Sequence, residues 1–269
     1  MVKTLCFIIR QMLLLASLST LIGCATTATG RQQLILMPAD QISQMGITAF
    51  NDLKAAKKVH PSGKNVNYIH CITQAMTRTL TNTSWEVALF VDDSPNAFAL
   101  PGNKIGIHSG LIALTDNPDQ LAAVIGHEIS HVLARHSNER LSQKMALQQG
   151  LMLSTKISAP NTQLGKTALS LLGLGGHYGI LLPFSRLHEQ EADILGLTLM
   201  AKAGFDPQQS ITLWQKMAQA NQQHASEFLS THPSYHHRIE TLSQHMPTAL
   251  ALSKEANALG RNPHCTPSL

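Results

Sequence analysis

The feature that most constrains this chain is a long segment with apolar residues at helical spacing, predicted as one helix over residues 118–149. Asn117-Pro118 opens the segment, since Pro is well tolerated in the first turn of a helix. The segment contains His127-Glu128-Ile129-Ser130-His131. Because residues four apart share one face of a helix, the two histidines project side by side, one turn apart. The sequence therefore predicts an apolar helix that presents two imidazoles together.

Two imidazoles at this spacing suit two ligands of a tetrahedral Zn²⁺ ion. Glu128 sits beside the first histidine, where it can reach a metal-bound water but not easily the metal. Zn²⁺ lowers the pKa of that water to roughly 7, and the carboxylate can take the proton as the water attacks a peptide carbonyl. Zinc is inferred from the ligand types, which also hold other first-row ions. The pattern is short enough to occur by chance, and its place within a periodic helix favours the metal.

A catalytic zinc site needs a third protein ligand and an open fourth position. Glu189 and Asp193 are four residues apart in a predicted helix over residues 188–203, so they share one face. One carboxylate can bind the metal, and the other can accept the free N–H of a ligand histidine. His136 is expected on the helix surface or behind a ligand, and Glu191 is expected to face solvent.

Three short strands, residues 85–91, 97–100 and 104–108, are predicted to form a small antiparallel sheet. The predicted fold class is mainly α with this sheet (α+β). Further helices are predicted over residues 40–58, 65–81, 206–220 and 233–246. Residues 150–184 are nearly free of charge and rich in glycine, which favours a flap or buried hairpin over a membrane helix.

The N-terminal segment, residues 1–23, has two basic residues and an apolar stretch too short for a comfortable membrane span. Small and apolar residues directly before Cys24 resemble a bacterial lipobox, which implies cleavage before Cys24 and acylation of its thiol. Ala25 then favours the outer membrane. The predicted location is the periplasmic face of the bacterial outer membrane, lipid-anchored at Cys24. The predicted domains are a signal peptide (1–23), a lipidated tether (24–30), a metallopeptidase domain (31–250) and a tail (251–269).

Composition limits the remaining possibilities. The 269 residues are 43% hydrophobic with a formal net charge of +4, so there is material for one core and no concentrated basic face. Nucleic acid is therefore not an expected partner. Cys71 and Cys265 remain after the N-terminal cysteines are set aside, in a compartment expected to permit disulfides. They either pair and staple the tail to the body, which we favour, or are one buried and one exposed thiol.

The two motifs above follow an Asn-Ala-Phe-Ala-Leu-Pro-Gly stretch at residues 96–102, and in this order they resemble the HtpX/CAAX-prenyl-protease type of zinc metallopeptidase. The lipobox and Ser185-Arg186 resemble its LoiP-like periplasmic lipoprotein branch, related to YcaL and BepA. The resemblance covers about residues 29–246. It implies a gluzincin-type fold with one Zn²⁺ per chain. The implied ligands are His127, His131 and Glu189, with Glu128 as base and Asp193 behind a ligand histidine.

The resemblance also implies roles for two other segments. Asn96, Ala97, Phe98 and Ala99 match an active-site edge strand, to which an extended substrate can add by main-chain hydrogen bonds; the alternative is a plain core strand. His232 matches a residue over the metal, which either fills the fourth zinc position at rest or helps to hold the oxyanion. Arg238 is implied to neutralise developing charge. The alternative is a loop histidine and an exposed arginine.

The leading functional prediction is an endopeptidase that cuts unfolded or misassembled envelope proteins. Its expected partners are these substrates, the membrane through Cys24, and envelope assembly machinery or a related protease. A second hypothesis is a chaperone-like outer-membrane protein assembly factor that binds clients along the same edge strand with little proteolysis. A third is a membrane-embedded protease in which residues 150–184 span the bilayer. Replacement of Glu128 by Gln separates the first two, because only a protease loses its effect.

Overall fold

The computed structural model describes residues 24–80, 84–157, 185–223, 232 and 235–266. These residues divide into two compact units. The smaller unit contains residues 24–38 and 138–157, and the larger contains residues 39–137 and those from 185 onward. Residues 158–184 of the segment predicted as a flap lie outside the described residues. The predicted signal peptide, residues 1–23, lies outside them as well. No helix among the described residues is long and apolar enough to cross a membrane.

The smaller unit is a two-stranded ribbon packed on one helix. Strand β1 (Cys24–Thr26) pairs antiparallel with β2 (Gln32–Leu34). Arg31 makes two hydrogen bonds of 2.7 Å to the carboxylate of Glu139, which lies in helix α6 (His136–Ile157). The residues predicted as a tether are thus the first half of this ribbon.

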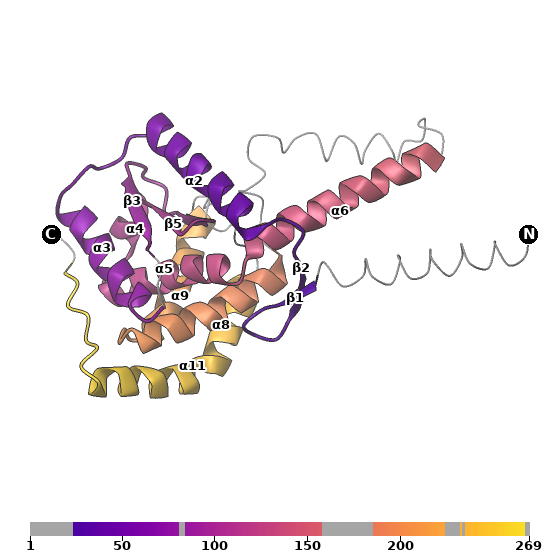
Figure 1. The fold of residues 1–269 in the computed structure, drawn as a ribbon. Coiled ribbons are helices and arrows are strands. Elements are labelled where there is room, and N and C mark those ends of the chain that lie inside the picture. Colours follow the sequence, from indigo (N-terminus) through magenta and orange to yellow (C-terminus); the bar gives the residue numbers. More distant parts are fainter. Residues whose placement is uncertain (1–23, 81–83, 158–184, 224–231, 233–234, 267–269) are drawn as a thin grey trace, which may run out of the picture. The chain divides into compact units, whose positions relative to one another are not determined.

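The larger unit is built around helix α5 (Pro118–Leu133), which is buried from Gln120 to His131. Such burial agrees with a sequence that is apolar around most of the helix. Asn117 caps the helix by accepting a 2.9 Å hydrogen bond from the backbone N–H of Gln120. In Figure 1, α5 lies between the strands on one side and the helices α8 (Arg186–Lys202) and α11 (Tyr235–Ala258) on the other.

The predicted single helix over 118–149 is in fact two helices. Helix α5 ends at Leu133 and α6 begins at His136, because Arg135 adopts a positive φ of 56°. This left-handed conformation ends the run of helical hydrogen bonds and changes the direction of the chain. Arg135 carries no sequence signal for such a break, since Gly or Asn is the usual residue there.

The sheet differs from the prediction in its topology. Strands β3 (Glu86–Phe90), β4 (Ala97–Leu100) and β5 (Lys104–His108) have the order β3-β5-β4. The pair β4–β5 is antiparallel, but β3–β5 is parallel, so the sheet is mixed. The tight turn after β4 carries β5 back between the other two strands, so β3 and β4 do not meet. Among the described strands, β4 pairs only with β5 and lies at an edge.

Other helices surround this core and extend it. They are α2 (Ala39–Ala56), α3 (Lys64–Thr77), α4 (Ser109–Leu114) and α9 (Gln208–Gln223). Helix α11 continues past Pro247, where the sequence predicted its end, and buries Ala249 and Ala256. Part of the predicted tail is therefore helical. Cys71 and Cys265 form a disulfide with a Cα–Cα distance of 5.7 Å, so the paired alternative is the one confirmed.

Candidate metal centre

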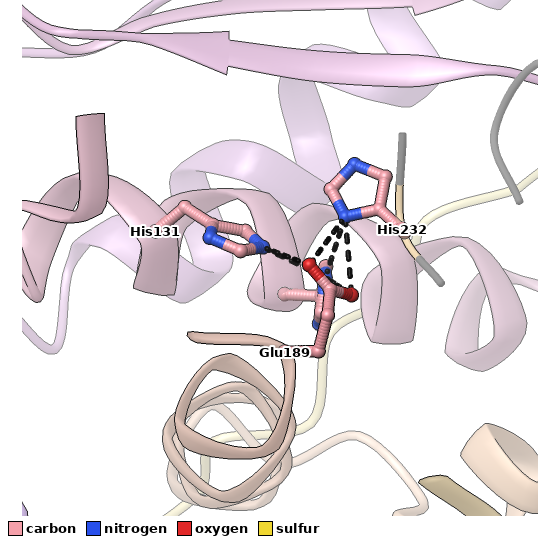
Figure 2. A group of neighbouring side chains, drawn as sticks. His131, Glu189 and His232 are labelled. Atoms are coloured by element: carbon pink, nitrogen blue, oxygen red, sulfur yellow. Dashed lines mark hydrogen bonds and ion pairs between the residues drawn. The ribbon is translucent and has the colours of Figure 1, made fainter. Parts of the chain in front are cut away.

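Four side chains from three parts of the chain meet at one buried point. His127 and His131 come from α5, Glu189 comes from α8, and His232 precedes α11. Nε2 of His131 lies 3.0 Å from Nε2 of His127. Each of these nitrogens is 3.4 Å from an oxygen of Glu189. Figure 2 shows the carboxylate of Glu189 between His131 and His232, whose Nδ1 lies 3.0 Å from it.

This spacing fits a metal ion. Ligand atoms bound at 2.0–2.1 Å in a tetrahedron are about 3.3 Å from one another. The distances between neighbouring ligand atoms in this group run from 3.0 to 3.4 Å. The donor set is also appropriate, because three imidazole nitrogens and one carboxylate are ligands that Zn²⁺ prefers. Without a cation the lone pairs of these ligand atoms repel one another, whereas a divalent cation between them would attract all of them.

Two glycines allow the ligand-bearing helices to approach this closely. Gly126 of α5 and Gly196 of α8 face each other at the helix crossing. A Cβ atom on Gly196 would lie 2.8 Å from the backbone nitrogen of His127, well inside ordinary contact. Absence of both side chains therefore brings the backbones together at His127 and sets the distance across which Glu189 reaches the histidines.

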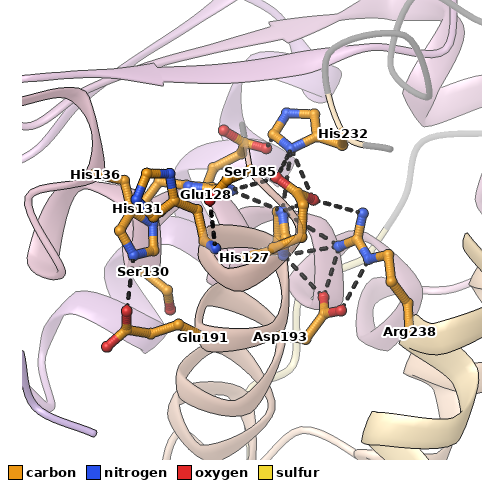
Figure 3. Close-up of polar contacts among 12 residues, drawn as sticks. His127, Glu128, Ser130, His131, His136, Ser185, Glu191, Asp193, His232 and Arg238 are labelled. Atoms are coloured by element: carbon orange, nitrogen blue, oxygen red, sulfur yellow. Dashed lines mark hydrogen bonds and ion pairs between the residues drawn. The ribbon is translucent and has the colours of Figure 1, made fainter. Parts of the chain in front are cut away.

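A buried ion pair holds His127 from behind. Nδ1 of His127 lies 3.0 Å from Oδ1 of Asp193. Arg238 donates to both oxygens of the same carboxylate, at 2.6 and 2.9 Å, and its guanidinium stacks 3.5 Å from the ring centre of Trp214. Nη2 of Arg238 also lies 2.8 Å from Nδ1 of His127. A proton on Nδ1 that is donated to Asp193 would direct the lone pair of Nε2 toward a metal, which is how second-sphere carboxylates commonly orient a histidine ligand. Arg238 is buried rather than exposed, and Figure 3 shows it beside Asp193.

Electrostatics within the group favour the metal-binding protonation states of Glu189 and His131, but not that of His127. Burial opposes ionisation of Glu189, but His232 and Arg238 outweigh it and hold its pKa well below the usual range. Burial lowers the pKa of His131 well below its ordinary value, which keeps the imidazole neutral. Burial and Arg238 also act to lower the pKa of His127, but its hydrogen bonds to Asp193 and Glu189 raise the pKa overall. Protons therefore compete with a metal at His127.

Glu128 is buried next to the ligands without joining them. Burial raises the pKa of its carboxyl above the usual range. Its Oε1 has no hydrogen-bond partner among the described residues, and Nε2 of His232 lies 3.4 Å from it. A buried carboxylate oxygen without a partner is costly unless a ligand or water meets it. The position suits a base that acts on a water bound at the metal group.

Two residues lie behind His131, one of which the sequence placed either there or on the surface and one of which it placed in solvent. Nδ1 of His136 is 2.9 Å from Nδ1 of His131, so this histidine lies behind a ligand and is not on the surface. Glu191, predicted to face solvent, is buried, and its Oε2 is 3.1 Å from Nε2 of His136. The prediction for Glu191 was wrong because it assumed a solvated face on a helix that is buried on most sides.

The predicted substrate strand has the expected place at the sheet edge. In Figure 2 the sheet passes over the ligand group on the side of His232. Helix α5 packs against β4. Asn96, Ala97 and Ala99 are buried and Phe98 is partly buried. Substrate binding there stays a prediction.

Comparison with known proteins identifies the family. The sequence profile of Peptidase family M48 matches residues 64–246. The mitochondrial metalloendopeptidase OMA1 of Schizosaccharomyces pombe is 38% identical over 172 residues, which is 63% of this chain and 49% of that protein. The OMA1 protein of Saccharomyces cerevisiae is 37% identical over 66% of this chain and 52% of its own length. The β-barrel assembly-enhancing protease of Yersinia pestis is 31% identical over 72% of this chain and 41% of its own length.

These relatives correct the predicted location. Three relatives at 34–38% identity are named mitochondrial metalloendopeptidase OMA1. Their names contradict the predicted location at the periplasmic face of a bacterial outer membrane. The lipid anchor at Cys24 was part of that prediction and falls with it. The finer resemblance to a LoiP-like branch stays a prediction.

The site and the comparisons agree on the chemistry. The matched region contains His127, His131, Glu189 and His232, the group that could hold a metal ion. It also contains Glu128, the buried carboxyl beside them. The chain spans about half the length, or less, of the curated relatives cited above. The chain belongs to peptidase family M48, a family of metallopeptidases.

Proposed function

We propose that this metallopeptidase is a zinc-dependent endopeptidase that hydrolyses peptide bonds in unfolded or misassembled proteins. The observation that carries the proposal is the position of Glu128, which is buried beside four ligand atoms at metal-binding spacing. One of its carboxylate oxygens has no hydrogen-bond partner in the part of the chain that the structure describes. A purely structural carboxylate would be expected to satisfy that oxygen.

In this proposal His127, His131 and Glu189 hold the ion. When bound, zinc lowers the pKa of a coordinated water to about 7 and polarises the carbonyl that is attacked. Glu128 takes the proton of the attacking water and delivers it to the leaving amine. Its raised pKa supports the first transfer, since a stronger base takes a proton from water more readily.

His232 and Arg238 act on this site from the side of α11. Nδ1 of His232 lies 3.3 Å from Nε2 of His127, so in our proposal His232 fills the fourth ligand position at rest and leaves when substrate binds. Arg238 is engaged with Asp193 and lies 3.0 Å from Glu189. We therefore assign Arg238 to holding these two carboxylates in place rather than to direct contact with the developing charge.

The position of β4 at the edge of the sheet, among the described strands, supports an extended, unfolded substrate. Main-chain pairing along Asn96–Ala99 would give affinity with little demand on sequence, which suits a protease for unfolded chains. Three relatives are named β-barrel assembly-enhancing protease, and this name makes unfolded β-barrel proteins a candidate substrate class. An assembly factor with little proteolysis is the competing outcome of the test below.

The test compares the purified chain with its Glu128→Gln variant, and measures metal content and cleavage of casein. Glu240→Gln, at an exposed glutamate in α11, serves as the matched control. We expect one equivalent of zinc in all three proteins, and a cleavage rate about 100- to 10,000-fold lower in Glu128→Gln alone. Equal cleavage by Glu128→Gln and its parent would refute the role of the base. Zinc without cleavage in the parent would favour the assembly factor, unless His232→Ala restores activity.

A further inference from the structure

Behind His131 lies a second histidine–carboxylate pair that the chemistry above does not use. Nδ1 of His136 lies 2.9 Å from Nδ1 of His131, and Nε2 of His136 lies 3.1 Å from Oε2 of Glu191. Figure 3 shows the three side chains in a row that leads away from the ligand group. All three are buried, with His136 fully shielded from solvent.

The positions of the protons in this row follow from the ligand role of His131. A neutral imidazole carries one N–H and one lone pair. Nε2 of His131 faces His127 and Glu189, so it must keep its lone pair to bind a metal, and the proton belongs on Nδ1. This N–H donates to Nδ1 of His136, which places the proton of His136 on Nε2, where it donates to Glu191. The opposite set of protons would place a hydrogen inside the ligand group.

The carboxylate at the end decides between the two sets. A carboxylate accepts but does not donate, so Glu191 favours the proton on the near nitrogen of His136. The ring of His136 is held in place by stacking on His188, with centroids 4.4 Å apart and planes 23° apart. The turn at Arg135, with its positive φ, brings His136 back toward His131.

One helix therefore orients both histidine ligands of α5. Helix α8 supplies Glu189 to the ligand group, Asp193 behind His127, and Glu191 behind His131. We infer that His136 and Glu191 form a positioning relay that fixes the proton of His131 on Nδ1, keeps its Nε2 available to the metal and raises the basicity of this ligand. The inference rests on the proposed metal site.

The test measures metal affinity rather than activity. Zn²⁺ dissociation constants of the parent chain, Glu191→Gln and His136→Phe are determined by competition with a chromophoric chelator. Glu191→Gln keeps the size of the side chain and removes its charge, and His136→Phe keeps a stacked ring but removes both nitrogens. We expect each to bind Zn²⁺ about 10- to 100-fold more weakly than the parent, the usual range for loss of a second-sphere partner. The control Glu240→Gln removes an exposed charge from α11 and should bind as the parent does.

Two further readouts separate a relay from a structural role. The visible spectrum of the Co²⁺-loaded proteins reports ligand geometry and should change in both relay variants but not in the control. The thermal midpoint of the metal-free proteins reports packing. A lower midpoint in either variant, with parental Zn²⁺ affinity and Co²⁺ spectrum, would overturn the relay and leave a packing role. A parent chain that binds no metal would instead overturn the metal site itself, and the relay with it.

Discussion

Substitution of Gly196 by Ala tests whether the helix crossing sets the geometry of the metal group. The added Cβ would lie 2.8 Å from the backbone nitrogen of His127 and 3.0 Å from the carbonyl carbon of Gly126. Ordinary contact begins at 3.4 Å, so α5 and α8 must separate by the difference between 3.4 and 2.8 Å, or 0.6 Å. Both clashing atoms belong to backbone and cannot rotate away.

The energetic consequence is a competition between two effects. Gly to Ala inside a helix ordinarily stabilises by about 1 kcal/mol, whereas overpacking a close contact costs about 1–3 kcal/mol. We therefore expect the free energy of unfolding of the metal-free chain to fall by about 0–2 kcal/mol. Metal binding should suffer more, because ligand distances tolerate only about 0.2 Å of error and Glu189 would move with α8.

The assay combines thermal unfolding of the metal-free proteins with zinc affinity from chelator competition. We expect Gly196→Ala to lose at least tenfold in affinity, equivalent to about 1.4 kcal/mol. Gly126→Ala is the matched comparison, since its nearest contact at 2.7 Å is the flexible end of Met76 and its backbone contact is longer, at 3.0 Å. It should lose less. If Gly196→Ala unfolds and binds zinc as the parent does, the close crossing does not position the ligands.

Three further predictions follow from other parts of the molecule. Zinc affinity should fall as the pH drops through the raised pKa of His127, because this ligand must lose its proton to bind the metal. Below that pKa the fall should be about tenfold per pH unit. Chelator competition at several pH values measures the affinity, and a flat pH profile would contradict the prediction. Cys71→Ser should lower the free energy of unfolding by about 2–5 kcal/mol, and reductant should shift the parent by the same amount in denaturant titrations. Asn117→Ala should lower the free energy of unfolding by about 1 kcal/mol in the same denaturant titration, because α5 loses its N-terminal cap. An unchanged midpoint would show that Pro118 alone starts the helix.

Much of the local structure could be predicted from the sequence. The periods of apolar residues predicted α2, α3, α8 and the three strands, and β4 matches its predicted range of 97–100. The four-residue spacing of His127 and His131 placed both on one helical face, where the structure has them. Such patterns can be recognised in a sequence because the repeat of a helix or strand is fixed by its own backbone.

Contacts between distant elements could not be predicted in the same way. The parallel pairing of β3 with β5, the turn at Arg135 and the extension of α11 past Pro247 depend on what each segment packs against. Glu191 illustrates the limit. Its position in the helical repeat could be predicted from the sequence. Whether its side chain is exposed to solvent or contacts His136 depends on the fold, because His136 lies 55 positions away in the chain.

The sequence by itself determined the chemistry available to this chain: two imidazoles on one helical face, a neighbouring carboxyl, and two acids four residues apart on another helix. Tertiary structure alone decided that these helices cross at Gly126 and Gly196, closely enough for Glu189 to complete the ligand group. It also decided that Asp193 and the His136–Glu191 pair stand behind the two histidines. The physical reason is that residue spacing fixes directions within one element, whereas distances between elements are fixed by the packing of their surfaces.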